Sequence, residues 1–437
     1  WRDHAQAHAL AARDISAFHA DIDFGKLRAR RTDLSGVPRT GAIVRLYASR
    51  LALGEGMKNE RPMMRGPIQP YVLYVPKSYS PRRRAPLTLM LHSLAAGYNQ
   101  YAVFAPEIYT QIGEQRGSLM LTPAGRGPDG WYHDEAEVDV FEAWADVARR
   151  YAIDAERVSI SGYSMGGYGT YKLATMYPDL FARAFAVVGP PDEDITGGPT
   201  GGRIPQLEDT ENTIHVLDNM RNVPMLMWNG MNDELVPVAG PINLERRLHE
   251  LGYQHRLDLF PGYDHFLFSL RDEWGPGSDW LGNARRLRSP AHVTFRAFPE
   301  MDRPKLGLVH DHAYWLSGIR VASGARSGLV DAVSLVHARL DPLMTDVLPA
   351  GTDPSLHLQL GLTPTPISLA RPSSNAIVLT LTDVASLVVW PEAAGLRRGA
   401  VTIRWSSNVP ATITFAGTFG AVSVKVPAGS ASRVVRL

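Results

Sequence analysis

Short apolar runs alternate with segments of helical periodicity along the first two thirds of the chain. The apolar runs predict buried strands at residues 71–75, 87–91, 118–121, 158–161, 182–188, 224–228 and 256–260. Apolar residues at helical spacing predict helices between them, at residues 101–115, 138–151, 165–176 and 239–251. Strands that are apolar on both faces and alternate with helices are typical of a mostly parallel sheet covered by helices. We therefore predict an α/β fold.

The two ends of the chain have a different pattern of apolar and polar residues. An Ala-rich pattern predicts a helix at residues 3–20, and a proline-dotted stretch precedes the first strand. From about residue 289, short alternating runs separated by Gly, Pro, Ser and Asn are typical of an antiparallel β-sandwich. We expect a helical or irregular extension at 1–69 that packs on an α/β domain at 70–288. A β-rich, sandwich-like domain at 289–437 is expected to follow.

Composition narrows the chemistry more than the fold. The 437 residues include no cysteine, which excludes disulfides, thiolate nucleophiles and Cys-ligated metal sites. With 45 basic and 44 acidic residues the net charge is +1, so no global field favours nucleic acid. No apolar run is long enough to span a membrane. The chain begins at Trp1, from which we expect a processed or trimmed form that has lost a signal peptide or an upstream domain. We expect a secreted protein, with a cytoplasmic one as the alternative.

The chemistry centres on the sequence GYSMG at residues 162–166, which follows a predicted buried strand and opens a predicted helix. This is the G-x-S-x-G pattern in the strand, turn and helix context that it requires. Glycines flank Ser164 because the turn is tight and leaves no room for side chains. The turn lifts the Ser164 hydroxyl clear of the sheet, so Ser164 is the candidate nucleophile.

A serine hydroxyl needs a general base, usually a histidine held by a carboxylate. Asp233 follows a predicted strand and is the candidate acid, with Glu234 as its nearest rival. His265 follows the last predicted strand and is the candidate base. Asp264 is a weaker candidate for the acid, because adjacent residues on one loop rarely point at each other.

Two backbone N–H groups should bind the developing oxyanion. The N–H of Met165, directly after the nucleophile, is one candidate. The other is expected on the loop after residues 87–91, where we choose Leu94 over Ser93. Trp131, Tyr132 and Tyr98 are candidates for substrate binding. The alternative for Trp131 and Tyr132 is a hydrophobic clasp that holds the following helix.

These motifs resemble those of the α/β-hydrolase superfamily. Within it the chain resembles secreted esterases related to polyhydroxybutyrate depolymerases and feruloyl or acetylxylan esterases, and it is similar to the catalytic domain of prolyl-oligopeptidase-like hydrolases. The resemblance covers roughly residues 70–270 and departs from the usual His-Gly pattern at His92-Ser93. It implies an acyl-enzyme mechanism without a cofactor. The sequence His310-Asp311-His312 lacks a third ligand in register, so we assign no metal.

The leading hypothesis is a carboxylic-ester hydrolase that acts on small-molecule, aryl or polymeric esters. The polymeric substrate rests on analogy, because accessory β-sandwiches often bind surfaces or glycans. A prolyl-oligopeptidase-like serine peptidase is the alternative enzyme, although the sequence offers no clear charged subsite for a peptide terminus. A non-catalytic binding protein on the same fold is the third hypothesis. No nucleic-acid partner or oligomeric state is predicted.

Overall fold

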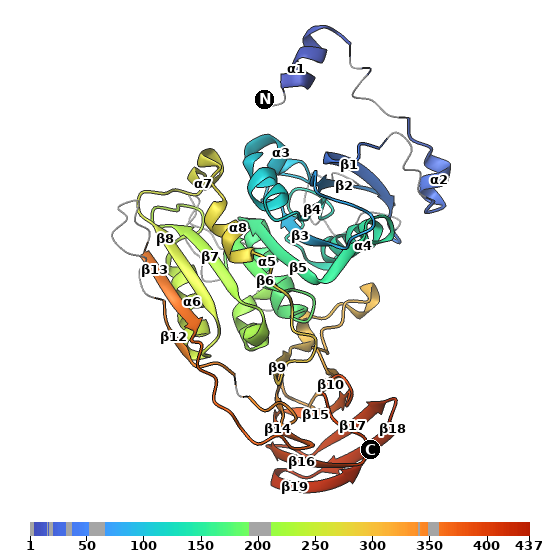
Figure 1. Ribbon diagram of the computed structural model, residues 1–437, viewed down its shortest axis with the longest axis vertical. Coiled ribbons are helices and arrows are strands. Elements are labelled where there is room, and N and C mark those ends of the chain that lie inside the picture. Colours follow the sequence, from blue (N-terminus) through green and yellow to red (C-terminus); the bar gives the residue numbers. More distant parts are fainter. Residues whose placement is uncertain are drawn as a thin grey trace. The chain divides into compact units, whose positions relative to one another are not determined.

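The structure is a computed structural model. It describes residues 4–14, 16, 21–31, 37–51, 66–191, 211–339, 341–347 and 358–437. The chain forms two compact units, each of which combines segments that are distant in sequence (Figure 1). The first unit contains Trp1–Asp154 and Phe266–Gly282, and the second contains Ala155–His265 and Asn283–Leu437. No helix in the described part of the chain is both long and apolar enough to cross a membrane.

The first unit contains a mixed group of strands in the order β1-β2-β4-β3. β3 pairs with β4 in parallel, whereas β2 pairs with β1 and β4 antiparallel. All seven residues of β3 are buried, as its continuous apolar sequence predicts. The four strands of the first unit are β1(Gly41–Ala48), β2(Ile68–Val75), β3(Ala85–Leu91) and β4(Leu119–Pro123). β1 lies in the extension that was expected to be helical or irregular.

Helical segments complete the first unit. They are α1(His4–Ala11), α2(Phe24–Arg28), α3(Gln100–Phe104), the π-helical η2(Tyr109–Glu114), α4(Asp134–Arg150), α7(Leu267–Arg271) and α8(Gly275–Leu281). The single helix predicted at 101–115 is wrong, because it is broken between α3 and η2. Pro106 disfavours helical dihedrals at the residue before it, and Ala105 has φ −143° and ψ 59°.

The second unit begins with a parallel arrangement that matches the predicted α/β rhythm. Its parallel strands are β5(Ile153–Tyr163), β6(Arg183–Val187), β7(Met225–Gly230) and β8(His255–Phe260). Its helices are α5(Met165–Met176), α6(Ala239–Glu250) and the 3₁₀ segments η4(Thr213–Asn222), η5(Pro299–Met301) and η6(Pro304–Leu306). α5 packs on β6, and α6 packs on β8. The carboxyl ends of these strands carry the site described below.

Two strands from the C-terminal part of the chain extend this arrangement. β13(Leu358–Pro364) pairs antiparallel with β8, and β12(Met344–Asp346) pairs antiparallel with β13. β8 was expected to be the last strand of the α/β region, and this expectation is wrong. The sequence does not reveal the extension because β13 is distant from β8 in the chain and its apolar pattern is no different from that of a sandwich strand.

The remaining C-terminal strands form two sheets, in the orders β10-β15-β17-β18 and β19-β16-β14-β11-β9. They enclose a core that includes Trp315, Phe295 and Trp405. The strands are β9(His292–Ala297), β10(Leu316–Val321), β11(Gly328–Ser334), β14(Ala376–Thr382), β15(Val384–Val389), β16(Ala400–Ser407), β17(Ala411–Gly417), β18(Gly420–Val426) and β19(Gly429–Arg436).

The expectation of a purely antiparallel sandwich is wrong in one respect. β14 pairs with β16 in parallel, and β15 pairs with β17 in parallel. The chain alternates between the two sheets over these four strands, so the neighbours within each sheet are two strands apart in sequence and run the same way. Asp383, at φ 56°, forms the corner between β14 and β15.

Candidate active site

Ser164 lies on a strained turn between β5 and α5. Its dihedrals are φ 57° and ψ −117°, which a non-glycine residue adopts only where the surroundings enforce them. The Ser164 N–H donates to the Val187 carbonyl at 2.9 Å, which ties the turn to the end of β6. A Cβ at position 162 would lie 2.2 Å from the Gly166 carbonyl oxygen, so the turn requires Gly162. The hydroxyl of Ser164 therefore sits at the carboxyl end of the strands, as the G-x-S-x-G motif predicts.

The loops that follow β7 and β8 are bonded to each other. The N–H groups of Met231 and Asn232 donate to the carbonyls of Phe260 and Tyr263, both at 3.0 Å. A Cβ at position 230 would lie 2.2 Å from the Tyr263 carbonyl oxygen, so this close approach requires Gly230. The two loops thus bring Asp233 and His265 to one place.

The structure brings together the three side chains predicted to form the triad. His265 Nε2 lies 2.9 Å from Ser164 Oγ, and His265 Nδ1 lies 2.9 and 3.0 Å from the two carboxylate oxygens of Asp233. Asp233 and His265 are buried, whereas Ser164 is partly accessible. The carboxylate oxygens can only accept, so Nδ1 carries the imidazole proton. Nε2 then directs a lone pair at the Ser164 hydroxyl and can accept its proton.

Contacts around the triad hold its members in place. Asp233 Oδ1 accepts from the N–H groups of Leu235 at 3.0 Å and Val236 at 2.7 Å, which orients the carboxylate. The Glu234 carboxylate instead accepts from the backbone N–H of His265 at 3.3 Å. The Tyr163 hydroxyl donates to the His265 carbonyl at 2.5 Å.

Sequence reasoning did not identify Tyr163 or Glu234 as supports of the histidine. Both are neighbours of motif residues, but the direction of their side chains depends on loops that are far apart in sequence. Proximity to the motif was the one available signal.

In the first unit, the backbone N–H groups of Ser93, Leu94 and Ala95 follow β3 and differ in their hydrogen-bond partners. The Ser93 N–H donates to Gln100 Oε1 at 2.6 Å, and the Ala95 N–H donates to the Pro128 carbonyl at 2.8 Å. No described residue accepts a hydrogen bond from the Leu94 N–H. This pattern favours Leu94 over Ser93 as the oxyanion donor. In the second unit, Met165 is the first residue of α5, where a helix leaves N–H groups without intrahelical partners.

Ser93 occupies the position where the resembled families usually have glycine. Its hydroxyl accepts from Gln100 Nε2 at 2.9 Å, while Gln100 Oε1 accepts from its N–H. Gln100 is buried at the start of α3. The two contacts fix both the side chain and the backbone of Ser93 and thereby set the conformation at Leu94.

The predicted substrate-binding residues lie beside this loop. Tyr132 is fully buried, and its hydroxyl donates to the His92 carbonyl at 3.0 Å. Trp131 is also buried, whereas Tyr98 is half-buried. For Tyr132, these contacts favour the clasp over a wall of the substrate site, because its ring is buried and its hydroxyl is bonded to the His92 backbone carbonyl. The roles of Trp131 and Tyr98 stay predictions.

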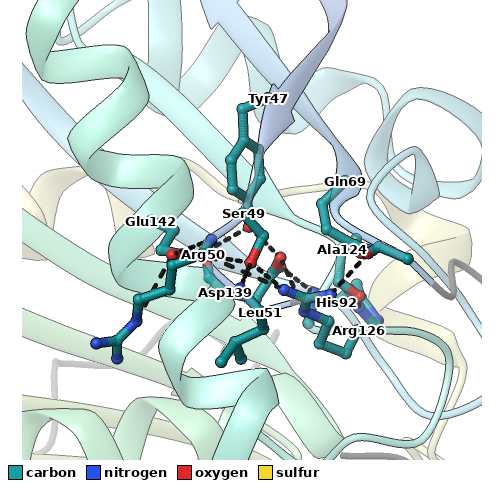
Figure 2. A network of polar contacts seen from close by, with 12 residues as sticks. Tyr47, Ser49, Arg50, Leu51, Gln69, His92, Ala124, Arg126, Asp139 and Glu142 are labelled. Carbon is teal, nitrogen blue, oxygen red and sulfur yellow. Dashed lines mark hydrogen bonds and ion pairs between the residues drawn. The ribbon is translucent and has the colours of Figure 1, made fainter. Parts of the chain in front are cut away.

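A buried polar network supports the same part of the first unit (Figure 2). Side chains from β1, α4 and the loop after β4 converge in it, and Tyr47 and Arg126 both face Oδ1 of Asp139. Asp139 accepts from the Tyr47 hydroxyl and from the Gly125 N–H, the latter at 2.8 Å. The adjacent Ala124 carbonyl lies 2.8 Å from Nε2 of the buried His92. The network therefore holds in place the backbone at residues 124–125, which the His92 side chain contacts.

Burial raises the pKa of Asp139 to about 6, against the lowering effect of its donors and of Arg126. Because the folded protein then binds a proton that the unfolded chain releases, stability should fall as pH rises from about 4 to 6. The shift corresponds to a contribution of at most about 3 kcal/mol. We expect Asp139→Asn to remove this part of the pH dependence, as measured by urea unfolding at several pH values. An unchanged slope in the variant would assign the pH dependence to other groups.

The fold and this arrangement define the class of protein. The chain has an α/β-hydrolase fold, and its Ser164, His265 and Asp233 side chains have the arrangement of a serine-hydrolase triad. Residues 130–274 match the prolyl oligopeptidase family, Peptidase_S9. The matched segment contains Ser164, Asp233 and His265.

Similar proteins include both peptidases and an esterase. Over 240 residues the chain is 25% identical to a probable dipeptidyl-aminopeptidase B of Colletotrichum graminicola, covering 49% of this chain and 26% of that protein. Over 223 residues it is 26% identical to dipeptidyl peptidase family member 1 of Caenorhabditis elegans, covering 45% of this chain and 27% of that protein. A thermostable esterase of known structure is 22% identical, with a TM-score of 0.40 over 56% of this chain and 63% of that chain. The chain thus matches only about a quarter of the length of these two curated relatives.

Proposed function

We propose that this serine hydrolase cleaves carboxylic esters through a Ser164–His265–Asp233 triad. The observation that carries the proposal is the hydrogen-bonded series from Ser164 Oγ through the imidazole to the Asp233 carboxylate. The strained backbone of Ser164 supports it, because such strain is typical of functional positions.

In the proposed reaction, Ser164 Oγ attacks the ester carbonyl while His265 Nε2 takes its proton. Asp233 stabilises the imidazolium that forms, and the N–H group of Met165 binds the oxyanion, with Leu94 as the second donor that the sequence predicts. His265 then returns the proton to the leaving alcohol, which gives an acyl-enzyme on Ser164. Water activated by the same imidazole releases the carboxylic acid and restores the serine.

A peptidase activity is the second candidate, and the match to the prolyl oligopeptidase family favours it. Two considerations support the ester instead. An ester needs only a nucleophile, a base and the oxyanion donors, whereas an exopeptidase also needs a charged subsite for the peptide terminus. The sequence offers no clear subsite of that kind.

The two candidates are separated by comparing esters with amides. We expect kcat/KM for p-nitrophenyl butyrate to exceed that for Gly-Pro p-nitroanilide by about 1000-fold or more, a difference of about 4 kcal/mol in transition-state stabilisation. Serine peptidases also cleave activated esters, so the anilide is the diagnostic substrate. Efficient cleavage of the anilide would overturn the ester proposal in favour of the peptidase. Feruloyl esters, acetylated xylan and polyhydroxybutyrate would then distinguish aryl from polymeric ester substrates.

A further inference from the structure

A second group of ionisable side chains lies in the second unit, on α6 and β8. Glu245 and His249 are one turn apart on α6, and His255 is the first residue of β8. One potential ligand atom from each residue lies within 4.8 Å of the other two. The Glu245 and His255 residues are buried, whereas His249 is exposed. α6 packs directly on β8, so the three side chains meet at this interface.

The tautomer of His255 leaves a lone pair facing the carboxylate. His255 Nδ1 lies 2.8 Å from the Tyr253 carbonyl oxygen, which can only accept, so Nδ1 carries a proton. His255 Nε2 lies 3.1 Å from Glu245 Oε1, and the side chain is fully buried. A neutral imidazole would direct a lone pair at a carboxylate oxygen. A cation, either a proton or a metal ion, is therefore needed between these two atoms.

His249 also lies between two carboxylates, although at ion-pair distance and not at hydrogen-bond distance. Its Nδ1 lies 3.6 Å from Glu245 Oε1, while its Nε2 lies 3.6 Å from Asp346 Oδ1. Asp346 is brought there by the strand pairing, because it is opposite Leu362 on β13 and Leu362 is opposite His255 on β8. Metal-binding histidines commonly direct their second nitrogen at a carboxylate or a backbone carbonyl. His255 has such a partner in the Tyr253 carbonyl, and the Asp346 carboxylate lies 3.6 Å from the second nitrogen of His249.

We propose that Glu245, His249 and His255 bind one Zn²⁺ ion, with solvent completing a tetrahedral shell. Two imidazoles and one carboxylate are a ligand set that Zn²⁺ accepts. The separations of 3.1 and 3.6 Å from Glu245 Oε1 bracket the spacing of roughly 3.3 Å between ligands about 2.0 Å from a tetrahedral ion. The ion would link α6 to β8 beside the added strand β12. This site is separate in its residues from the proposed triad and does not depend on the ester reaction.

The test is Zn²⁺ binding by the full chain after treatment with EDTA and removal of the chelator. We expect isothermal titration calorimetry and metal analysis to give one Zn²⁺ per chain, and Zn²⁺ to raise the melting temperature. His249→Ala should weaken binding by more than about 100-fold, because loss of a ligand should exceed the effect of losing an outer partner. His312→Ala is the matched control. Its side chain is 43% exposed against 47% for His249, and it also lies near a single aspartate.

Asp346→Ala provides a second variant that does not alter a ligand. Its carboxylate is largely exposed, and its removal should weaken Zn²⁺ binding by about 10- to 100-fold. Circular dichroism in EDTA checks that each variant is folded. Absence of stoichiometric binding by the wild type, or equal affinity in the wild type and all variants, would overturn the proposal. Glu245 and His255 would then form an ordinary ion pair.

Discussion

Ser164→Ala is expected to lower kcat for ester hydrolysis by at least about 10⁴-fold, because the covalent step loses its nucleophile. KM should change little, since the methyl group occupies the same turn. The rate is measured with a p-nitrophenyl ester. A fluorophosphonate provides a check that is independent of substrate: it should form an O–P bond with the wild-type serine, with loss of fluoride, and the variant should not gain the added mass.

Ser161→Ala is the matched control for this substitution. Ser161 lies three residues earlier on β5, is buried, and its hydroxyl has no hydrogen-bond partner among the described residues. Its removal should leave the hydrolysis rate close to that of the wild type. If Ser164→Ala retained full activity while remaining folded, the nucleophile would have to be another residue.

Asp233→Asn is expected to reduce kcat by about 10³- to 10⁴-fold. The asparagine amide has no negative charge to stabilise the imidazolium. Its NH₂ group can also donate to His265 Nδ1, the nitrogen whose proton the aspartate accepts. An asparagine oxygen can still accept from the Leu235 and Val236 N–H groups, so the turn should persist. The loss should therefore appear in kcat, with little change in the melting temperature.

Glu234→Gln is the counterpart, because it tests the rival acid on the same loop. Glu234 contacts the backbone N–H of His265 and not its ring, and a glutamine oxygen can replace that acceptor. We expect a loss of less than about tenfold, equivalent to about 1.4 kcal/mol. A larger loss in Glu234→Gln than in Asp233→Asn would move the role of the acid to Glu234.

The local pattern predicted the α/β region well because its elements are fixed by short-range periodicity. β3 and β7 are largely apolar strands and are buried throughout. The predicted helix at 165–176 has the same bounds as α5. The predicted helix at 101–115 is wrong because Pro106 interrupts it, and helical periodicity alone does not register the backbone restriction that a proline imposes on the residue before it.

Pairing between distant segments was beyond the reach of the sequence. β13 follows β8 by about a hundred residues, and its pattern does not indicate which sheet edge it joins. The parallel pairs of the sandwich arise from the alternation of the chain between two sheets, which local periodicity does not encode. Strand existence depends on neighbours in the chain, whereas strand pairing depends on loop closure over long separations.

The two candidate sites show this division most clearly. The sequence determined the chemistry of the first, because Ser164, Asp233 and His265 each follow a recognisable strand and occur in the order that the fold requires. Only the tertiary structure decided that the ring of His265 contacts Asp233 and not Glu234. The tertiary structure alone brings Glu245, His249 and His255 together. In the sequence, the visible candidate for metal ligands is the run His310-Asp311-His312. The reason is geometric: a motif records neighbours along the chain, but ligand atoms must converge in space, and that convergence is set by helix and strand packing.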